Sequence, residues 1–197
     1  MKNPIISFFQ NRTYKTDDIS AKHHIAELIA RLARAQNAKI IVETGTFRGL
    51  TTLELAQENP QATIYTFEMD PKILRQARLL FGISGYKNIV LVEGDVLKTL
   101  PQAIGGKTVD FAFLDDAKKN YRENFENLLP HLSESALVCA HDTNFRPNES
   151  DDAIQFGKYL AGHPEFSAIQ VDWSDRGLTI AQKRGSKQKR KQPAGGI

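Results

Sequence analysis

The sequence predicts an α/β fold in which helices cover both faces of a mostly parallel sheet. Three observations lead to it: short apolar runs alternate with amphipathic stretches, the runs are rich in Ile, Val and Phe, and several end in an acidic residue. Strands that are apolar throughout are typical of parallel sheets buried on both faces. The 197 residues, of which 41% are hydrophobic, fit one domain with a substantial core.

Seven apolar runs are the predicted strands. They occupy residues 39–44, 62–68, 88–94, 109–115, 136–142, 166–173 and 178–183. Only "SDRG" separates the last two, which is hairpin spacing. The expected fold is therefore doubly wound and Rossmann-like, with a mostly parallel seven-stranded sheet that ends in a C-terminal antiparallel hairpin.

Five amphipathic stretches are the predicted helices, at 18–37, 50–58, 71–81, 119–131 and 151–162. In the first, apolar residues such as Ile25, Ile29 and Leu32 recur at helical spacing. Pro71 follows Asp70, a good capping residue, at the expected start of the third. We expect a single domain over 1–183, preceded by an N-terminal extension at 1–17.

Composition predicts a cytoplasmic protein without a membrane segment. No apolar run approaches the roughly 20 residues needed to span a bilayer, and the first residues lack the pattern of a signal peptide. The single cysteine, Cys139, cannot form an internal disulfide, which favours a reducing compartment. Because it falls within a strand, we expect it to be a small buried residue.

The net charge of +3 comes from the C-terminus. Residues 183–197 hold six Lys and Arg and no acid, and the rest of the chain has 20 basic against 23 acidic residues. We expect 184–197 to be a disordered basic tail. The body of the domain lacks the basic surface of a nucleic-acid-binding protein, so contact with nucleic acid is expected only through this tail.

Acidic residues stand at the ends of five successive predicted strands. Ligands of open α/β sheets bind outside the carboxyl ends of the strands. Acids gathered there indicate a ligand with hydroxyl and amino groups and few phosphates. The five are Glu43, Glu68, Asp95, Asp115 and Asp142.

The stretch "IVETGTFRG" (41–49) narrows the choice of ligand. Leu50 follows the last glycine where a P-loop needs lysine, and Glu43 stands where the dinucleotide fingerprint has its first glycine. A carboxylate there repels a pyrophosphate but suits an ammonium group, while the helix that opens at Gly49 favours an anion. Glu68 has the position of a ribose ligand, and Gly45 allows close backbone approach. A zwitterion joined to a nucleoside describes S-adenosylmethionine.

Several motifs give the chain a resemblance to class I S-adenosylmethionine-dependent methyltransferases, and within them to the small O-methyltransferases of the catechol and caffeoyl-coenzyme A type. The resemblance covers roughly residues 20–183. The motifs that carry it are "VETGTFRGLTT", "TFEMDP", "EGDV", "FLDDAKKNY" and "DRGLTIAQK".

The resemblance implies a set of cofactor-binding residues. Glu43 is expected at the methionine end, Gly45 beneath the cofactor, Thr51 at its carboxylate, Glu68 at the ribose, and Asp95 with Val96 beside the adenine. The full implied set is Glu43, Gly45, Thr46, Gly49, Thr51, Glu68, Met69, Asp95, Val96 and Asp115.

The resemblance also implies catalytic and metal-binding residues. Lys118 is the expected base, with a pKa lowered by the sulfonium and a metal ion, and Asp115 is expected to act with it. His141 is the rival base; its alternative interpretation is a histidine held by hydrogen bonds. Asp115 and Asp142 are the expected ligands of Mg²⁺ or another divalent cation. The chain departs from the family pattern in two respects. Thr143 follows Asp142 where the family has Asn, and Asn144 comes one place late; Ala117 stands at the middle Asp of the lysine motif, and Asp116 comes one place early.

The predicted function is transfer of a methyl group from S-adenosylmethionine to a small hydroxylated acceptor. Three alternatives remain open: methylation of a sugar hydroxyl, methylation of RNA, and cofactor binding without catalysis. The "AHD" stretch resembles a branch of the fold that methylates sugar hydroxyls. From resemblance alone we also expect a homodimer.

Overall fold

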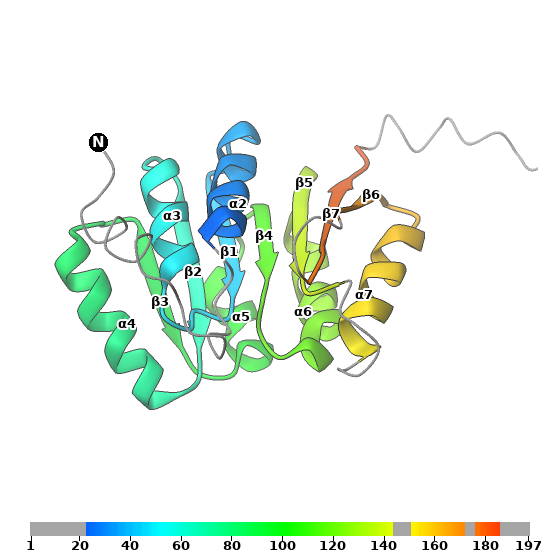
Figure 1. Cartoon of the computed structure of the whole chain (residues 1–197). Coiled ribbons are helices and arrows are strands. Elements are labelled where there is room, and N and C mark those ends of the chain that lie inside the picture. The colour runs from blue at the N-terminus through cyan, green and yellow to red at the C-terminus, as the bar shows by residue number, and fades with distance from the viewer. Residues whose placement is uncertain (1–22, 144–150, 172–175, 186–197) are drawn as a thin grey trace, which may run out of the picture.

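The structure is a computed structural model, and it describes residues 23–143, 151–171 and 176–185 (Figure 1). The strands are β1 (Ile40–Thr44), β2 (Thr63–Glu68), β3 (Ile89–Glu93), β4 (Val109–Leu114), β5 (Leu132–His141), β6 (Phe166–Val171) and β7 (Leu178–Lys183). The helices are α2 (His23–Ala35), α3 (Leu50–Glu58), α4 (Pro71–Ser84), α5 (Val96–Ile104), α6 (Tyr121–Leu128) and α7 (Asp151–Gly162), with 3₁₀ turns η1 (Lys118–Asn120) and η2 (Leu129–His131).

Within the described ranges, the strands form one seven-stranded sheet in the order β3-β2-β1-β4-β5-β7-β6. The first five of these pair in parallel, whereas β7 runs antiparallel to both β5 and β6. The predicted fold class, with its C-terminal antiparallel hairpin, is therefore confirmed. Among the described helices, none is both long and apolar enough to cross a bilayer.

The core has two layers because alternate residues of each central strand point to opposite faces of the sheet. In β4, Phe111 and Phe113 pack in one apolar cluster with residues of α2 and α3, while Ala112 and Leu114 pack in another with residues of α5, α6 and α7. All four side chains are fully buried. Each large apolar side chain buried in this way contributes about 1.5–3 kcal/mol. Cys139 is buried in β5, as expected.

Helix α5 was not among the predicted helices. It has nine residues and contains Pro101, which has no N–H to donate to the carbonyl of Leu97 one turn earlier. The side chain of Asn127 donates to that carbonyl instead, at 3.4 Å. A partner from α6 thus satisfies the group that proline leaves free, and this compensation cannot be read from the segment alone.

Some predicted boundaries shift. Strand β5 begins at Leu132, four residues before the apolar run at 136, and its pairing with β4 shifts register between Val109 and Phe111. Residues 1–22 and 186–197, which include the predicted extension and most of the basic tail, lie outside the described residues.

The carboxyl ends of the parallel strands meet at one edge of the sheet. Backbone hydrogen bonds tie the segments that follow them: Gly45 and Thr46 donate to the carbonyl of Phe67, Gly94 donates to that of Glu68, and Asp115 donates to that of Thr44. The segments that carry the predicted site are therefore fixed to one another.

Candidate active site

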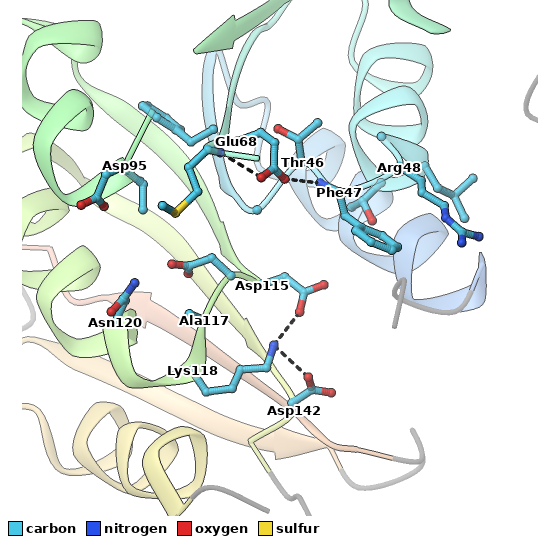
Figure 2. Close-up of a pocket in the computed structure, with 18 of the residues that line it drawn as sticks. Thr46, Phe47, Arg48, Glu68, Asp95, Asp115, Ala117, Lys118, Asn120 and Asp142 are labelled. Atoms are coloured by element: carbon cyan, nitrogen blue, oxygen red, sulfur yellow. Dashed lines mark hydrogen bonds and ion pairs between the residues drawn. The ribbon is translucent and has the colours of Figure 1, made fainter. Parts of the chain in front are cut away.

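A cavity of about 480 Å³ lies along this edge of the sheet (Figure 2). Its size is that of a small-molecule site, which typically measures about 300–1,000 Å³. Most of the predicted site residues line it: Gly45, Thr46, Gly49, Thr51, Glu68, Met69, Asp95, Val96, Asp115, Lys118 and Asp142. Figure 2 shows Glu68 and Asp95 toward one end and Lys118 with Asp142 toward the other.

Glu43 is the exception, and the structure does not support its predicted contact with the methionine end. Its side chain is buried behind the cavity wall and accepts hydrogen bonds from the hydroxyl groups of Thr52 (2.5 Å) and Thr66 (2.7 Å). Burial raises the pKa of Glu43 to about 7, although these hydrogen bonds oppose the shift. The carboxyl group therefore links β1 to α3 and β2 inside the protein.

The two glycines of the first loop are needed for packing within the protein. Gly45 has φ +89°, and a Cβ atom there would lie 2.7 Å from the backbone oxygen of Asp115. Gly49 has φ +75°, and a Cβ atom would lie 2.7 Å from the ring of Phe81. Glycine at 45 thus lets the loop after β1 lie directly against the end of β4, which carries Asp115.

Glu68 is held by backbone N–H groups. Its Oε1 accepts from Met69 (2.8 Å) and Asp70 (2.9 Å), and its Oε2 accepts from Phe47 (3.0 Å). A carboxylate has about four acceptor positions, so one remains on Oε2 for a ligand hydroxyl. Phe47 has φ +44°, which bulky residues rarely adopt, and its N–H joins the first loop to the end of β2.

The remaining cofactor candidates surround Glu68 on neighbouring segments. Asp95 caps α5 by accepting from the N–H of Leu97 at 3.1 Å, and Val96 is the buried first residue of that helix. Thr51 lies in the first turn of α3, and the hydroxyl group of Thr46 is hydrogen-bonded to that of Thr66 at 2.7 Å. Met69 is largely exposed.

Lys118 occupies the other end of the cavity, in η1 at the start of α6. Its Nζ lies 2.9 Å from Asp115 Oδ1 and 2.8 Å from Asp142 Oδ2 (Figure 2). It also donates to the phenol oxygen of Tyr121 at 2.8 Å. Tyr121 is fully buried and packs edge-on against Phe156.

These contacts hold Lys118 in its ammonium form. Burial alone would lower the pKa of Lys118, but Asp115 and Asp142 outweigh burial and raise it. Burial would likewise raise the pKa of Asp115, but Lys118 and His141 outweigh burial and lower it. The protein's own groups therefore act against the predicted lowering of the pKa of Lys118 by a sulfonium and a metal ion, which stays a prediction.

His141 is the last residue of β5, and it is not among the residues that line the cavity. Its Nδ1 lies 3.2 Å from Asp115 Oδ1 and 3.5 Å from Asp142 Oδ1. Burial would lower the pKa of His141, but Asp115 outweighs it and the pKa is raised. Of its two predicted roles, the structure shows the hydrogen-bonded histidine.

The predicted metal ligands lie together and fit a divalent cation. Asp115, His141 and Asp142 each offer a ligand atom, and these atoms lie within 4.8 Å of one another. Within the described part of the chain, Asp142 Oδ1 is buried without a hydrogen-bond partner. Thr143 does not replace the family's amide ligand, because its hydroxyl is bonded to that of Thr179 at 2.8 Å. Asn144 lies outside the described residues.

Asp116 and Arg176 are among the residues that line the cavity although sequence reasoning did not assign them to the site. Asp116 accepts from the hydroxyl of Thr44 at 2.7 Å and from the amide of Asn124, and burial raises its pKa. Arg176 precedes β7, with its Nη1 3.9 Å from Asp142 Oδ2. Because β7 pairs antiparallel with β5, the residues before it lie beside the end of β5, and this topology could have indicated Arg176.

Comparisons with known proteins identify the family of the chain. The family model described as "O-methyltransferase" matches residues 5–177. The catechol O-methyltransferase of Mycobacterium tuberculosis is 35% identical over 156 residues, which is 74% of this chain and 70% of that protein. The catechol O-methyltransferase of Niastella koreensis is 29% identical, over 73% of this chain and 61% of that protein.

A solved structure shows the same fold. The O-methyltransferase TomG from Streptomyces achromogenes, in complex with SAM, superposes with a TM-score of 0.78 over 94% of this chain and 92% of that one, at 24% sequence identity. With the family model matching most of the chain, the chain belongs to the O-methyltransferase family, and the predicted class of enzyme, an S-adenosylmethionine-dependent methyltransferase, is confirmed.

Proposed function

We propose that this enzyme methylates a hydroxyl oxygen of a small molecule that enters the cavity at the Lys118 end. The observation that carries the proposal is the division of one cavity into two unlike ends. Glu68 and Asp95, with an acceptor position left on Glu68, suit the hydroxyl and amino groups of a nucleoside. Lys118, held between Asp115 and Asp142, provides a fixed cation where an acceptor oxygen would meet the methyl group.

We assign Lys118 the role of stabilising the acceptor's oxyanion. An ammonium with a raised pKa is a poor base at neutral pH, but a fixed cation lowers the free energy of an oxyanion that forms beside it. Donor and acceptor held in the same cavity also gain from proximity, which contributes on the order of 7–11 kcal/mol in the most favourable model reactions. A divalent cation, when bound at Asp115 and Asp142, would polarise the acceptor oxygens further.

A catechol is the first acceptor to test, since two relatives carry that name. The purified full-length chain is incubated with S-adenosylmethionine labelled in its methyl group and with catechol, and labelled product is measured with and without Mg²⁺. Calorimetry measures binding of the cofactor and its demethylated product. We expect binding of both and methylated catechol. Cofactor binding without transfer to catechols, sugars or RNA would favour the non-catalytic alternative.

We also propose that residues 1–183 form the single domain, that 184–197 act as a basic tail, and that the protein is a cytoplasmic homodimer. The exposed side chains of Leu79 and Ile83, one turn apart on α4, provide an apolar surface for such a dimer. Light scattering tests the dimer, and removal of 186–197 tests the tail. Activity on small acceptors should survive the truncation, and any binding to RNA should be lost.

A further inference from the structure

The cluster at the end of β5 has a nitrogen ligand that the family pattern does not provide. From that cluster we propose that His141 is the third protein ligand of a divalent-metal site, together with Asp115 and Asp142. We further propose that this mixed nitrogen and oxygen set binds Mn²⁺ or a similar transition-metal ion more tightly than Mg²⁺. The inference deepens the proposed function, but its test does not depend on turnover.

The distances are those of neighbouring ligands on one ion. His141 Nδ1 lies 3.2 Å from Asp115 Oδ1 and 3.5 Å from Asp142 Oδ1. Metal bonds of about 2.0–2.2 Å place adjacent ligand atoms about 3.0 Å apart in an octahedral shell and about 3.4 Å apart in a tetrahedral one. The imidazole nitrogen therefore stands at a coordinating separation from each carboxylate, and the three ligand atoms all lie within 4.8 Å of one another.

Asp142 provides the independent observation. Its side chain is 5% exposed, and its Oδ1 lacks a hydrogen-bond partner among the described residues. Lys118 contacts the other oxygen, Oδ2, at 2.8 Å, so Oδ1 stays available on the side that faces His141. A buried carboxylate oxygen without a partner costs free energy, and a cation beside it removes that cost.

The residue at the family's amide position is already engaged. Thr143 is fully buried, its hydroxyl is bonded to that of Thr179, and its carbonyl accepts from the side chain of Gln170 at 2.9 Å. Among the described residues near the two aspartates, His141 offers the further ligand atom; its Nδ1 is hydrogen-bonded to Asp115 Oδ1, and a metal ion would take the place of the proton in that bond.

The ligand types determine the choice of ion. Imidazole suits transition metals such as Fe²⁺, Ni²⁺ and Zn²⁺, and carboxylates suit both Mn²⁺ and Mg²⁺. A mixed set therefore favours Mn²⁺, itself a transition-metal ion, over Mg²⁺, which prefers oxygen ligands and water. Asp115 and Asp142 line the cavity and His141 does not, so the three ligands approach from the protein side. On the cavity side, the ammonium group of Lys118 contacts both carboxylates.

The experiment titrates Mn²⁺ into the full-length chain without acceptor and follows free Mn²⁺ by electron paramagnetic resonance. Pulsed measurements on the bound ion detect nitrogen coupling. We expect one Mn²⁺ site with coupling to a histidine nitrogen, at least about tenfold tighter than Mg²⁺ in competition. In His141→Asn, the coupling should vanish and Mn²⁺ affinity should fall at least about tenfold.

His131→Asn is the matched control, because His131 lies in η2 just before the other end of β5, and it should change nothing. Cofactor binding by calorimetry shows whether His141→Asn is folded. If that variant fails to fold, the wild-type protein labelled with ¹⁵N-histidine answers the same question. The nitrogen coupling of the bound Mn²⁺ should change with the label if the ligand is a histidine nitrogen. Bound Mn²⁺ without nitrogen coupling, no bound Mn²⁺, or a loss of affinity in Asn144→Ala but not in His141→Asn would each overturn the proposal.

Discussion

The two ends of the cavity hold their acidic residues in different ways. At the end that we assign to the cofactor (the cofactor end), Glu68 accepts from three backbone N–H groups, and Asp95 accepts from the first turn of α5. At the end that we assign to methyl transfer (the reaction end), Asp115 and Asp142 are held by side chains, above all the ammonium group of Lys118. Backbone groups fix the first pair, and mutual charge fixes the second.

The difference determines what each end tolerates. A carboxylate held by backbone N–H groups has neutral partners that the local turn keeps in position. When that carboxylate is replaced, no charged group is left buried without a partner. A buried pair depends on both partners, and removal of one typically costs about 3–5 kcal/mol because the other stays buried without compensation. We therefore expect substitutions at the reaction end to reduce both activity and stability, and those at the cofactor end to act mainly on binding.

The largest effect is expected for Lys118→Met. It leaves Asp115 and Asp142 facing each other without their shared cation, so we expect a stability loss of about 3–5 kcal/mol. Turnover should fall by about 10²–10³, the usual cost of one lost oxyanion-stabilising donor. Urea unfolding and initial rates at saturating cofactor measure the two losses.

Lys118→Arg is the control that separates the two roles of the lysine. Arginine keeps the cation but is not a base at any pH near neutral. If Lys118 stabilises an oxyanion, the arginine variant should keep more activity than the methionine variant. Equal loss of activity in two folded variants would instead favour the base.

Glu43→Gln tests a buried carboxyl group of a third kind, because the hydrogen-bond partners of Glu43 are the hydroxyl groups of Thr52 and Thr66 and not a cation. Its pKa is raised from 4.5 to about 7, so the folded state binds the proton more tightly than the unfolded state. The associated stability is present below about pH 4.5 and is lost as pH rises to about 7, by up to about 3 kcal/mol. Glutamine stays neutral, so the variant should be the more stable protein at pH 8.

Thermal unfolding from pH 4.5 to pH 8 checks this prediction. The wild-type melting temperature should fall relative to that of Glu43→Gln across the window, and the exposed Glu123→Gln should follow the wild type. Parallel curves for wild type and Glu43→Gln would mean that Glu43 titrates normally.

The contrast also explains how much the sequence could predict. The sheet, its hairpin and the positions of Glu68, Asp95 and Asp115 follow from local patterns, since strand ends and helix caps are written in adjacent residues. The protonation of Lys118 does not, because it depends on Asp142, 24 positions further along the chain. The sequence motif predicts that Lys118 is a site residue, but only the folded structure shows that two carboxylates contact it.

Glu43 and α5 show the same limit. Glu43 has the sequence position of a ligand-binding acid, yet hydroxyl groups from α3 and β2 enclose it, and neither is adjacent in sequence. Helix α5 contains a proline that local rules count against a helix, and Asn127 from α6 satisfies the freed carbonyl. In both cases a hydrogen-bond partner from another helix or strand determines the local structure, and the local sequence does not contain that partner.

Glu68→Gln should lower cofactor affinity and should cost less stability than Lys118→Met, because it removes a backbone hydrogen bond but leaves no buried charge without a partner. The amide keeps one oxygen that accepts hydrogen bonds, but its NH₂ group cannot accept from backbone N–H groups or from a ribose hydroxyl. Loss of a hydrogen bond to a charged group costs about 1.5–3 kcal/mol, which corresponds to roughly 10- to 150-fold in affinity. Calorimetric titration with S-adenosylmethionine measures it, and unchanged affinity would place the ribose elsewhere.

The smallest effects are expected at Asp95, where capping and ligand binding can be separated. Asparagine caps a helix about as well as aspartate, whereas alanine costs about 1 kcal/mol. Asp95→Asn should therefore keep the wild-type melting temperature and Asp95→Ala should lower it. If the carboxylate also accepts from the adenine amino group, both variants should lose several-fold in cofactor affinity. A loss of cofactor affinity in the alanine variant alone would show that Asp95 affects binding only by capping α5. Backbone groups, and not this carboxylate, would then bind the ligand at this end of the cavity.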